Sequence, residues 1–77
     1  MDKAIASEKY RQLNQLFKEK RISEGYSMRD LGEMINEPHS FVQKVEANQR
    51  KLDLFQYVKY CEALGIDPAK TLKLLMK

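Results

Sequence analysis

Two short helical patterns, separated by about three residues, constrain the fold of this 77-residue chain more than any other feature. They occupy residues 27–46, which read SMRDLGEMINEPHSFVQKVE. Four aliphatic side chains are spaced so that they can meet between the two helices, namely Leu31, Ile35, Val42 and Val45. Gly32 lies where the two helices must cross closely. A side chain larger than that of Ala at this position would push the helices apart. Together these features predict a helix-turn-helix.

The ends of these two helices carry local signals. Ser27 is a candidate N-cap, and Asp30, three residues on, gives a variant of the capping box in which Glu or Gln is usual. Asn36 lies at the turn, where a left-handed backbone is often required, and Asn tolerates that backbone better than most non-glycine residues. Pro38 suits the first turn of the next helix, which does not need its missing N–H. We therefore expect helices that end at Asn36 and begin at Pro38.

The rest of the chain shows the same helical period and no strand pattern. Apolar residues recur along one side of the first helix, at Tyr10, Leu13, Leu16, Phe17 and Ile22. Others follow in the fourth helix, at Leu54, Phe55, Val58, Cys61 and Leu64. Candidate N-caps and stops bound these helices: Asp53, Asp67, Gly25 and Gly65. The sequence therefore predicts an all-α single domain over residues 1–77, with helices at residues 7–23, 27–36, 38–47, 54–64 and 68–75.

Composition excludes several classes of protein and of site. Cys61 is the only cysteine and His39 the only histidine, so we expect no internal disulfide, no protein-ligated zinc and no cofactor. The N-terminus lacks the long apolar stretch of a signal peptide, and no segment approaches the length that spans a membrane. An unpaired cysteine fits a reducing compartment, so we expect a cytoplasmic protein with no membrane partner. The net charge of +3 permits a polyanionic partner without requiring one.

Nothing in the sequence indicates catalysis. The chain has no Gly-rich phosphate loop and no cluster of metal ligands. Cys61 lies on the apolar face of its helix beside Val58 and Leu64, where an inert buried thiol is expected. We therefore expect a protein that is not an enzyme.

The ordered set of motifs resembles the Xre-type helix-turn-helix regulators, which include lambdoid phage repressors and restriction-modification controller proteins. Its parts are Arg21-Ile22-x-x-Gly25-x-Ser27, Leu31-Gly32-x-x-Ile35, Ser40-Phe41-Val42-x-Lys44-Val45-Glu46, residues 50–54 (RKLDL) and residues 61–68 (CEALGIDP). The resemblance extends from about Tyr10 to Leu75 and implies a five-helix, lambda-repressor-like DNA-binding domain.

The chain departs from the family pattern at four positions. Asn36 and Asn48 stand where glycine is common, which is physically sensible if both backbones are left-handed. Glu37 stands where an aliphatic residue usually packs, so we expect a wetter turn. Met28 replaces a glutamine that typically touches a DNA phosphate, which places that contact in doubt.

The resemblance implies that the second helix of the motif enters the major groove and that four of its residues face the bases: His39, Ser40, Gln43 and Lys44. Spacing supports this independently, because positions 40, 43 and 44 share one helical face. Gln43 can form a bidentate pair with adenine, and Lys44 can donate to guanine. Ser40 can bond in either direction, and His39 can donate to a guanine or a phosphate.

Other residues receive different roles from the same resemblance. The loop after that helix touches the sugar-phosphate backbone through Asn48, Gln49, Arg50 and Lys51. Arg29 is a further candidate for a phosphate contact. Arg21 and Glu46 look like a partly buried ion pair with a structural role.

Three further expectations concern the burial of aromatic residues. Phe41 belongs either to the core or to the edge of the groove against a thymine methyl, and the core is the commoner outcome. Tyr57 and Tyr60 are expected to be half-buried.

Taken together, the sequence predicts a sequence-specific regulator of transcription that binds double-stranded DNA, as a dimeric repressor. Leu74 and Met76 are left over once one face of the last helix docks on the core, which makes them candidates for homodimer contacts. The alternative is an antitoxin-like or protein-interaction module built on the same fold. The polar face at residues 39–44 argues for DNA.

Overall fold

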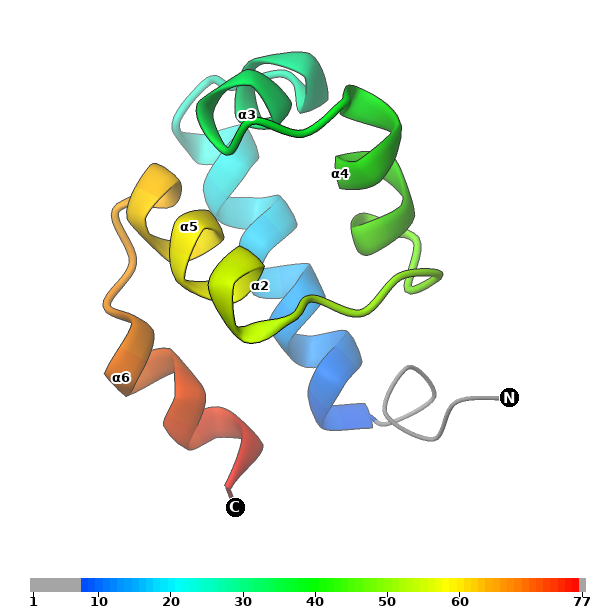
Figure 1. Cartoon of the computed structure of the whole chain (residues 1–77). Coiled ribbons are helices and arrows are strands. Elements are labelled where there is room, and N and C mark those ends of the chain that lie inside the picture. The colour runs from blue at the N-terminus through cyan, green and yellow to red at the C-terminus, as the bar shows by residue number, and fades with distance from the viewer. Residues whose placement is uncertain (1–7, 77) are drawn as a thin grey trace.

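The computed structural model describes residues 8–76, which contain five α-helices, one short 3-10 helix and no strand (Figure 1). The elements are α2 (Glu8–Ser23), α3 (Met28–Met34), α4 (His39–Glu46), α5 (Leu54–Leu64), α6 (Pro68–Leu72) and η1 (Lys73–Leu75). The predicted all-α class is confirmed. The last helix is shorter than predicted, because the chain tightens into a 3-10 turn after Leu72. Ser7, the predicted start of the first helix, lies outside the described residues.

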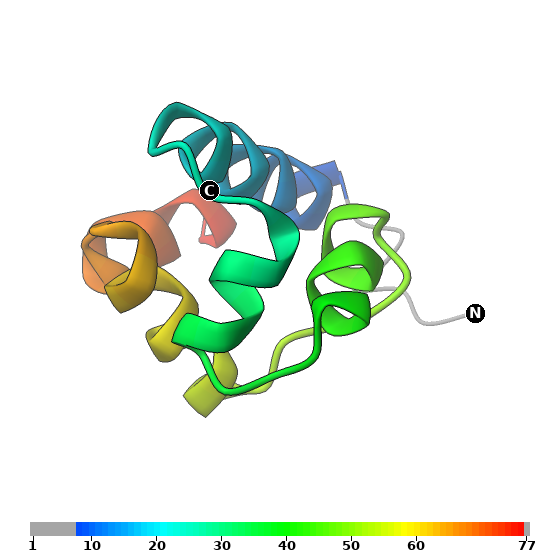
Figure 2. The same cartoon turned by 90° about the horizontal axis from the view of Figure 1, so that it is seen from above.

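Helices α3 and α4 form the helix-turn-helix and pack directly on one another. Helix α2 runs beneath them and contacts α4, α5 and η1. In both views of the cartoon α4 and α6 lie at opposite sides of the molecule (Figures 1 and 2). The C-terminal helices are therefore remote from the outer face of α4.

The local end signals predicted from the sequence are present in the structure. Ser27 and Asp30 form a reciprocal capping box, with hydrogen bonds of 2.9 Å in both directions. Asn36 and Asn48 have left-handed backbones, with φ of 60° and 61°. Pro38 differs from expectation: its ψ of 156° is extended, so it is the N-cap of α4 and the helix begins at His39.

An apolar core lies between α2, α3, α4 and α5. Its buried members are Leu13, Phe17, Leu31, Ile35, Phe41, Val42, Val45, Tyr57, Tyr60, Cys61 and Leu64. The expectation that Tyr57 and Tyr60 are half-buried is wrong, because they are 7% and 0% exposed. Phe17 packs against both rings, with centroids 6.2 and 4.9 Å away, and the Tyr57 hydroxyl donates to the carbonyl of Pro68 at 2.6 Å. The core interpretation of Phe41 is confirmed.

Several large apolar residues lie on the surface, and three of them belong to the apolar patterns predicted from the sequence: Ile22, Leu54 and Phe55. Ile22 is 57% exposed, because its neighbour Arg21 takes the inward position and reaches across to Glu46. Met34, the last residue of α3, is 47% exposed. At the start of α5, Leu54 and Phe55 are also largely exposed. No helix within residues 8–76 is long and apolar enough to cross a membrane.

The capping box of α3 makes part of the stability depend on pH. The backbone N–H and hydroxyl of Ser27 hold the pKa of Asp30 below its ordinary value of 3.8. A carboxyl whose pKa is lowered by folding stabilises the native state above its unfolded pKa, and this stability is lost as the pH falls through the folded pKa.

We expect the melting temperature of Asp30→Asn to fall less steeply than that of the wild type below about pH 4, because the amide still accepts from Ser27 but does not titrate. Thermal melts followed by circular dichroism from pH 6 to about pH 2 check this. Glu33→Gln, which alters an exposed carboxylate of the same helix, is the control. Parallel curves for Asp30→Asn and the wild type would contradict the expectation.

Candidate nucleic-acid interface

Helix α4 is divided into an apolar inner face and a polar outer face. Phe41, Val42 and Val45 are buried, because they fill the space over α2 and α3. The four residues expected to face bases are all exposed on the other side: His39, Ser40, Gln43 and Lys44. The structure therefore brings these four together on one solvent-facing surface.

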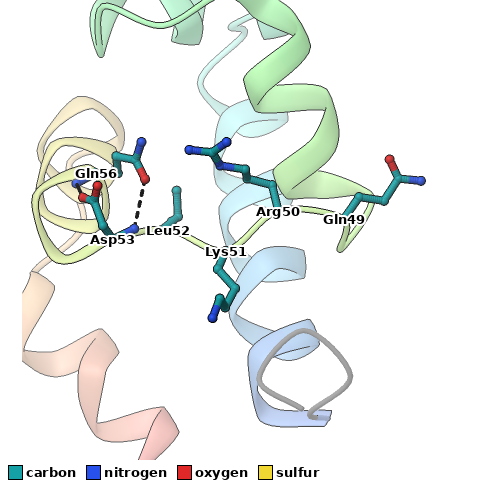
Figure 3. A pocket seen from close by; sticks show the side chains of 6 residues that line it. All are labelled: Gln49, Arg50, Lys51, Leu52, Asp53 and Gln56. Atoms are coloured by element: carbon teal, nitrogen blue, oxygen red, sulfur yellow. Dashed lines mark hydrogen bonds between the residues drawn. The ribbon is translucent and has the colours of Figure 1, made fainter. Parts of the chain in front are cut away.

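The loop that leaves α4 carries the predicted phosphate contacts. Asn48 turns the chain with its left-handed backbone, and the N–H of Gln49 closes the helix on the carbonyl of Lys44 at 2.8 Å. Gln49, Arg50 and Lys51 are exposed. In Figure 3 these three side chains point in different directions, with Arg50 toward the start of α5 and Gln49 away from it.

Arg50 lies between two shallow clefts beside the loop. One cleft is lined by Gln49, Arg50, Lys51, Leu52, Asp53 and Gln56 (Figure 3). The other is lined by Glu37, Pro38, Ser40, Phe41, Lys44 and Arg50, which joins the loop to the outer face of α4. The guanidinium carbon of Arg50 lies 5.0 Å from the centre of the Phe41 ring, a cation–π contact between the loop and a residue of α4.

Two residues of α3 differ in their availability to DNA. Arg29 is exposed, as a phosphate contact requires. Met28 is partly buried and packs against the core. Its thioether side chain contributes packing at this position instead of a hydrogen bond.

The structure joins Arg21 and Glu46 across 25 positions of sequence. Nε of Arg21 lies 2.6 Å from Oε2 of Glu46, and Nη2 lies 3.1 Å from Oε1, which makes the pair bidentate. Nη1 also donates to the carbonyl of Tyr26 at 2.7 Å. The hydrogen bond to Glu46 raises the pKa of Arg21. The pair ties α2 to the C-terminal end of α4 and fixes the direction of that helix.

Glu37, expected to leave the turn wet, is half-buried and has a polar neighbour. The amide of Gln56 donates to its carboxylate at 3.5 Å, so α5 supports the turn between α3 and α4. An aliphatic residue would pack at this position, whereas Glu37 uses a hydrogen bond.

Sequence reasoning missed two polar residues of α2 that contact the loop. Asn14 donates to the side-chain oxygen of Asn48 at 2.9 Å, and the hydroxyl of Tyr10 accepts from the N–H of Leu52 at 2.7 Å. Asn14 carried a signal, because it falls on the inward face of α2 between Leu13 and Phe17. Within residues 8–76 no group of His, Cys, Asp and Glu side chains is placed to hold a metal ion.

Comparison with known proteins gives the family. A family model described as Helix-turn-helix (HTH_3) matches residues 17–70. An XRE-family like protein from Pseudomonas syringae pv. tomato str. DC3000 is 33% identical, with a TM-score of 0.82 over 96% of this chain and 92% of that chain. The restriction-modification controller protein C.AhdI from Aeromonas hydrophila is 29% identical, with a TM-score of 0.74 over 80% of this chain and 94% of that chain.

A third solved structure shares the fold at lower identity. The clp gene regulator ClgR from Corynebacterium glutamicum is 19% identical, with a TM-score of 0.77 over 88% of this chain and 72% of that chain. A comparison with curated protein sequences gave no match. The family model spans well over half of the chain, and the Pseudomonas protein agrees with it in both sequence and fold. The chain therefore belongs to the HTH_3, or Xre-type, family of helix-turn-helix DNA-binding proteins, which are regulators rather than enzymes.

Proposed function

We propose that the protein is a sequence-specific repressor of transcription that binds double-stranded DNA as a dimer and inserts α4 into the major groove. The observation that carries this proposal is the outer face of α4, where all four predicted base-contacting side chains are exposed. A helix with such a face fits the width of the major groove, where each base pair presents a distinct pattern of donors and acceptors.

Each of the four side chains has its own proposed contact with DNA. Gln43 pairs with the N6 and N7 positions of adenine, and Lys44 donates to the O6 and N7 positions of guanine. Ser40 bonds either to a base or to a phosphate, and His39, at the first turn of α4, donates to a guanine or a phosphate.

The positioning contacts come from the loop and from α3. Beyond the end of α4, phosphates accept hydrogen bonds from Gln49, Arg50, Lys51 and the side-chain amide nitrogen of Asn48. On α3, Arg29 binds a further phosphate. Such contacts hold the domain in register without reading sequence, and each neutralised phosphate steepens the salt dependence of binding.

A dimer places two α4 helices one turn of DNA apart, which a palindromic operator requires. Leu74 and Met76 are 41% and 77% exposed, as a dimer contact would require. Leu54 and Phe55 are more exposed still, at 75% and 80%, and they follow the loop directly. These apolar residues of α5 are therefore part of the proposed dimer surface.

Cys61 is a free, buried thiol, which fits the reducing cytoplasm.

The relative C.AhdI is named a controller protein, which supports a role in regulating genes. Repression follows when the bound dimer covers a promoter and excludes the transcription machinery. An antitoxin-like or protein-interaction module remains the alternative and is separated from the proposal by the following experiment.

The decisive measurement is binding of the wild type and of Gln43→Ala/Lys44→Ala to an operator selected from a random DNA library. We expect the preference for the operator over a random duplex to fall about a hundred-fold in the variant, because two base contacts are lost. Fluorescence anisotropy at two salt concentrations measures both affinities. Analytical ultracentrifugation of the same mixtures gives the number of chains per operator, and two chains are expected.

Lys70→Ala is the control, because Lys70 is an exposed charge on α6, on the opposite side of the molecule from α4 (Figure 1). It should keep the preference of the wild type. A wild type that selects no sequence and prefers no duplex contradicts the proposal and favours the protein-interaction module. One chain per operator contradicts the dimer alone.

A further inference from the structure

Two polar side chains of α2 hold the loop after α4 at its two ends. The amide of Asn14 donates to Oδ1 of Asn48, where the loop begins, and the hydroxyl of Tyr10 accepts from the N–H of Leu52, where it ends. Tyr10 and Asn14 lie four residues apart and therefore share one face of α2. Each bond joins segments that are distant in sequence, by 34 and 42 positions.

The burial of Asn14 indicates a role beyond core packing. Its side chain is 1% exposed between Leu13 and Phe17, where an aliphatic residue would pack at no cost in desolvation. Within the part of the chain that the structure describes, its Oδ1 atom has no hydrogen-bond partner. The cost of desolvating the Asn14 amide is therefore only partly offset by hydrogen bonds. A leucine at this position would pack in the core but could not form the bond to Asn48.

The loop between these two bonds carries the charges. Asn48 closes α4 through its N–H on the carbonyl of Val45 at 3.1 Å, and its left-handed backbone then turns the chain outward. Gln49, Arg50 and Lys51 follow, and the next N–H, that of Leu52, is bound by Tyr10. Because both ends are tied to α2, the three side chains leave the surface from fixed positions.

We propose that Tyr10 and Asn14 are positioning residues for phosphate binding: they preorganise the loop at residues 48–52 so that its side chains meet the DNA backbone together. The inference rests on the proposed DNA-binding function and deepens it. Fixing the loop in its bound conformation removes an ordering cost that would otherwise weaken each contact.

The test compares Asn14→Leu and Tyr10→Phe with the wild type on the selected operator, by titrations over a range of salt concentrations. A loop that no longer reaches one phosphate flattens the slope of log Kd against log salt by about 0.9 and weakens binding about ten-fold at 0.1 M salt. We expect such a change in each variant. The preference for the operator over a base-substituted operator should persist, because α4 is unchanged.

Tyr57→Phe is the matched control. It makes the same Tyr-to-Phe change and removes a hydrogen bond of similar length, that to Pro68, but Tyr57 is held by α6 rather than by the loop. It should lose stability and keep the full salt slope. Circular dichroism at the temperature of the titrations shows whether each variant is folded. If Asn14→Leu does not fold, Tyr10→Phe, which removes a single hydroxyl, carries the test.

A double-mutant cycle with Asn48→Gly shows through which residue Asn14 acts. Glycine adopts a φ of +61° without strain, so this variant removes the side chain and keeps the turn. Adding Asn14→Leu to Asn48→Gly should weaken DNA binding no further. Additive effects of the two substitutions would show that the residues act independently and would overturn the inference that Asn14 acts through Asn48.

The outcomes separate the inference from the proposed function. A wild type with operator preference, together with unchanged salt slopes in both α2 variants, overturns the positioning role alone. A salt slope that is flattened in Tyr57→Phe as well would assign the change in slope to a general loss of stability, and it would also overturn the positioning role of Tyr10 and Asn14. A wild type without operator preference overturns the proposed function and the inference with it.

Discussion

Replacing Arg21 with Met is expected to lower the free energy of unfolding by about 3–5 kcal/mol, because it leaves the carboxylate of Glu46 buried without its partner. The Glu46 side chain is only 4% exposed, so water does not replace the guanidinium. The carbonyl of Tyr26 loses a donor at the same time. In a domain of this size such a loss is a large part of the total stability.

Urea unfolding followed by circular dichroism checks this expectation. Lys20→Met is the matched control on the same helix, because the pair of Lys20 with Glu24 is 37% and 40% exposed and contributes less than about 1 kcal/mol. The double variant Arg21→Met/Glu46→Leu should recover much of the loss, since it removes both charges. Equal effects of Arg21→Met and Lys20→Met would show that the buried pair is not the source of the stability.

Replacing Gly32 with Val is expected to destabilise the fold by about 3 kcal/mol or more, because the new side chain collides with backbone. A Cβ atom at this position would lie 2.6 Å from the carbonyl oxygen of Glu37 and 3.3 Å from the nitrogen of His39. Neither atom belongs to a flexible side chain that can move aside, so the turn between α3 and α4 must shift.

The same unfolding experiment measures the effect of Gly32→Val. Glu33→Val is the control, because it places the same β-branched residue at the next, exposed position of α3 and costs only a few tenths of a kcal/mol in helix propensity. Similar losses in the two variants would contradict the steric explanation and assign the effect to helix propensity alone.

Features that depend on neighbouring residues were predictable from the sequence. The number and type of the helices follow from hydrophobic period, and the caps at Ser27 and Asp53 follow from side chains that bond within three residues. The left-handed turns at Asn36 and Asn48 follow from the backbone tolerance of asparagine. The polar face of α4 follows from period alone, so its residues were identifiable without a structure.

Tertiary structure alone decided which side chains meet across the chain. The complete burial of Tyr60, the exposure of Ile22 and the contact of Gln56 with Glu37 depend on how α2, α5 and the turn pack, and a helical pattern leaves such choices open. The bonds of Tyr10 and Asn14 to the loop join residues 34 or more positions apart. Local propensity acts over a few residues, so the sequence by itself determined the helices and the polar outer face of α4, whereas only packing in three dimensions decided what holds the loop beside that face.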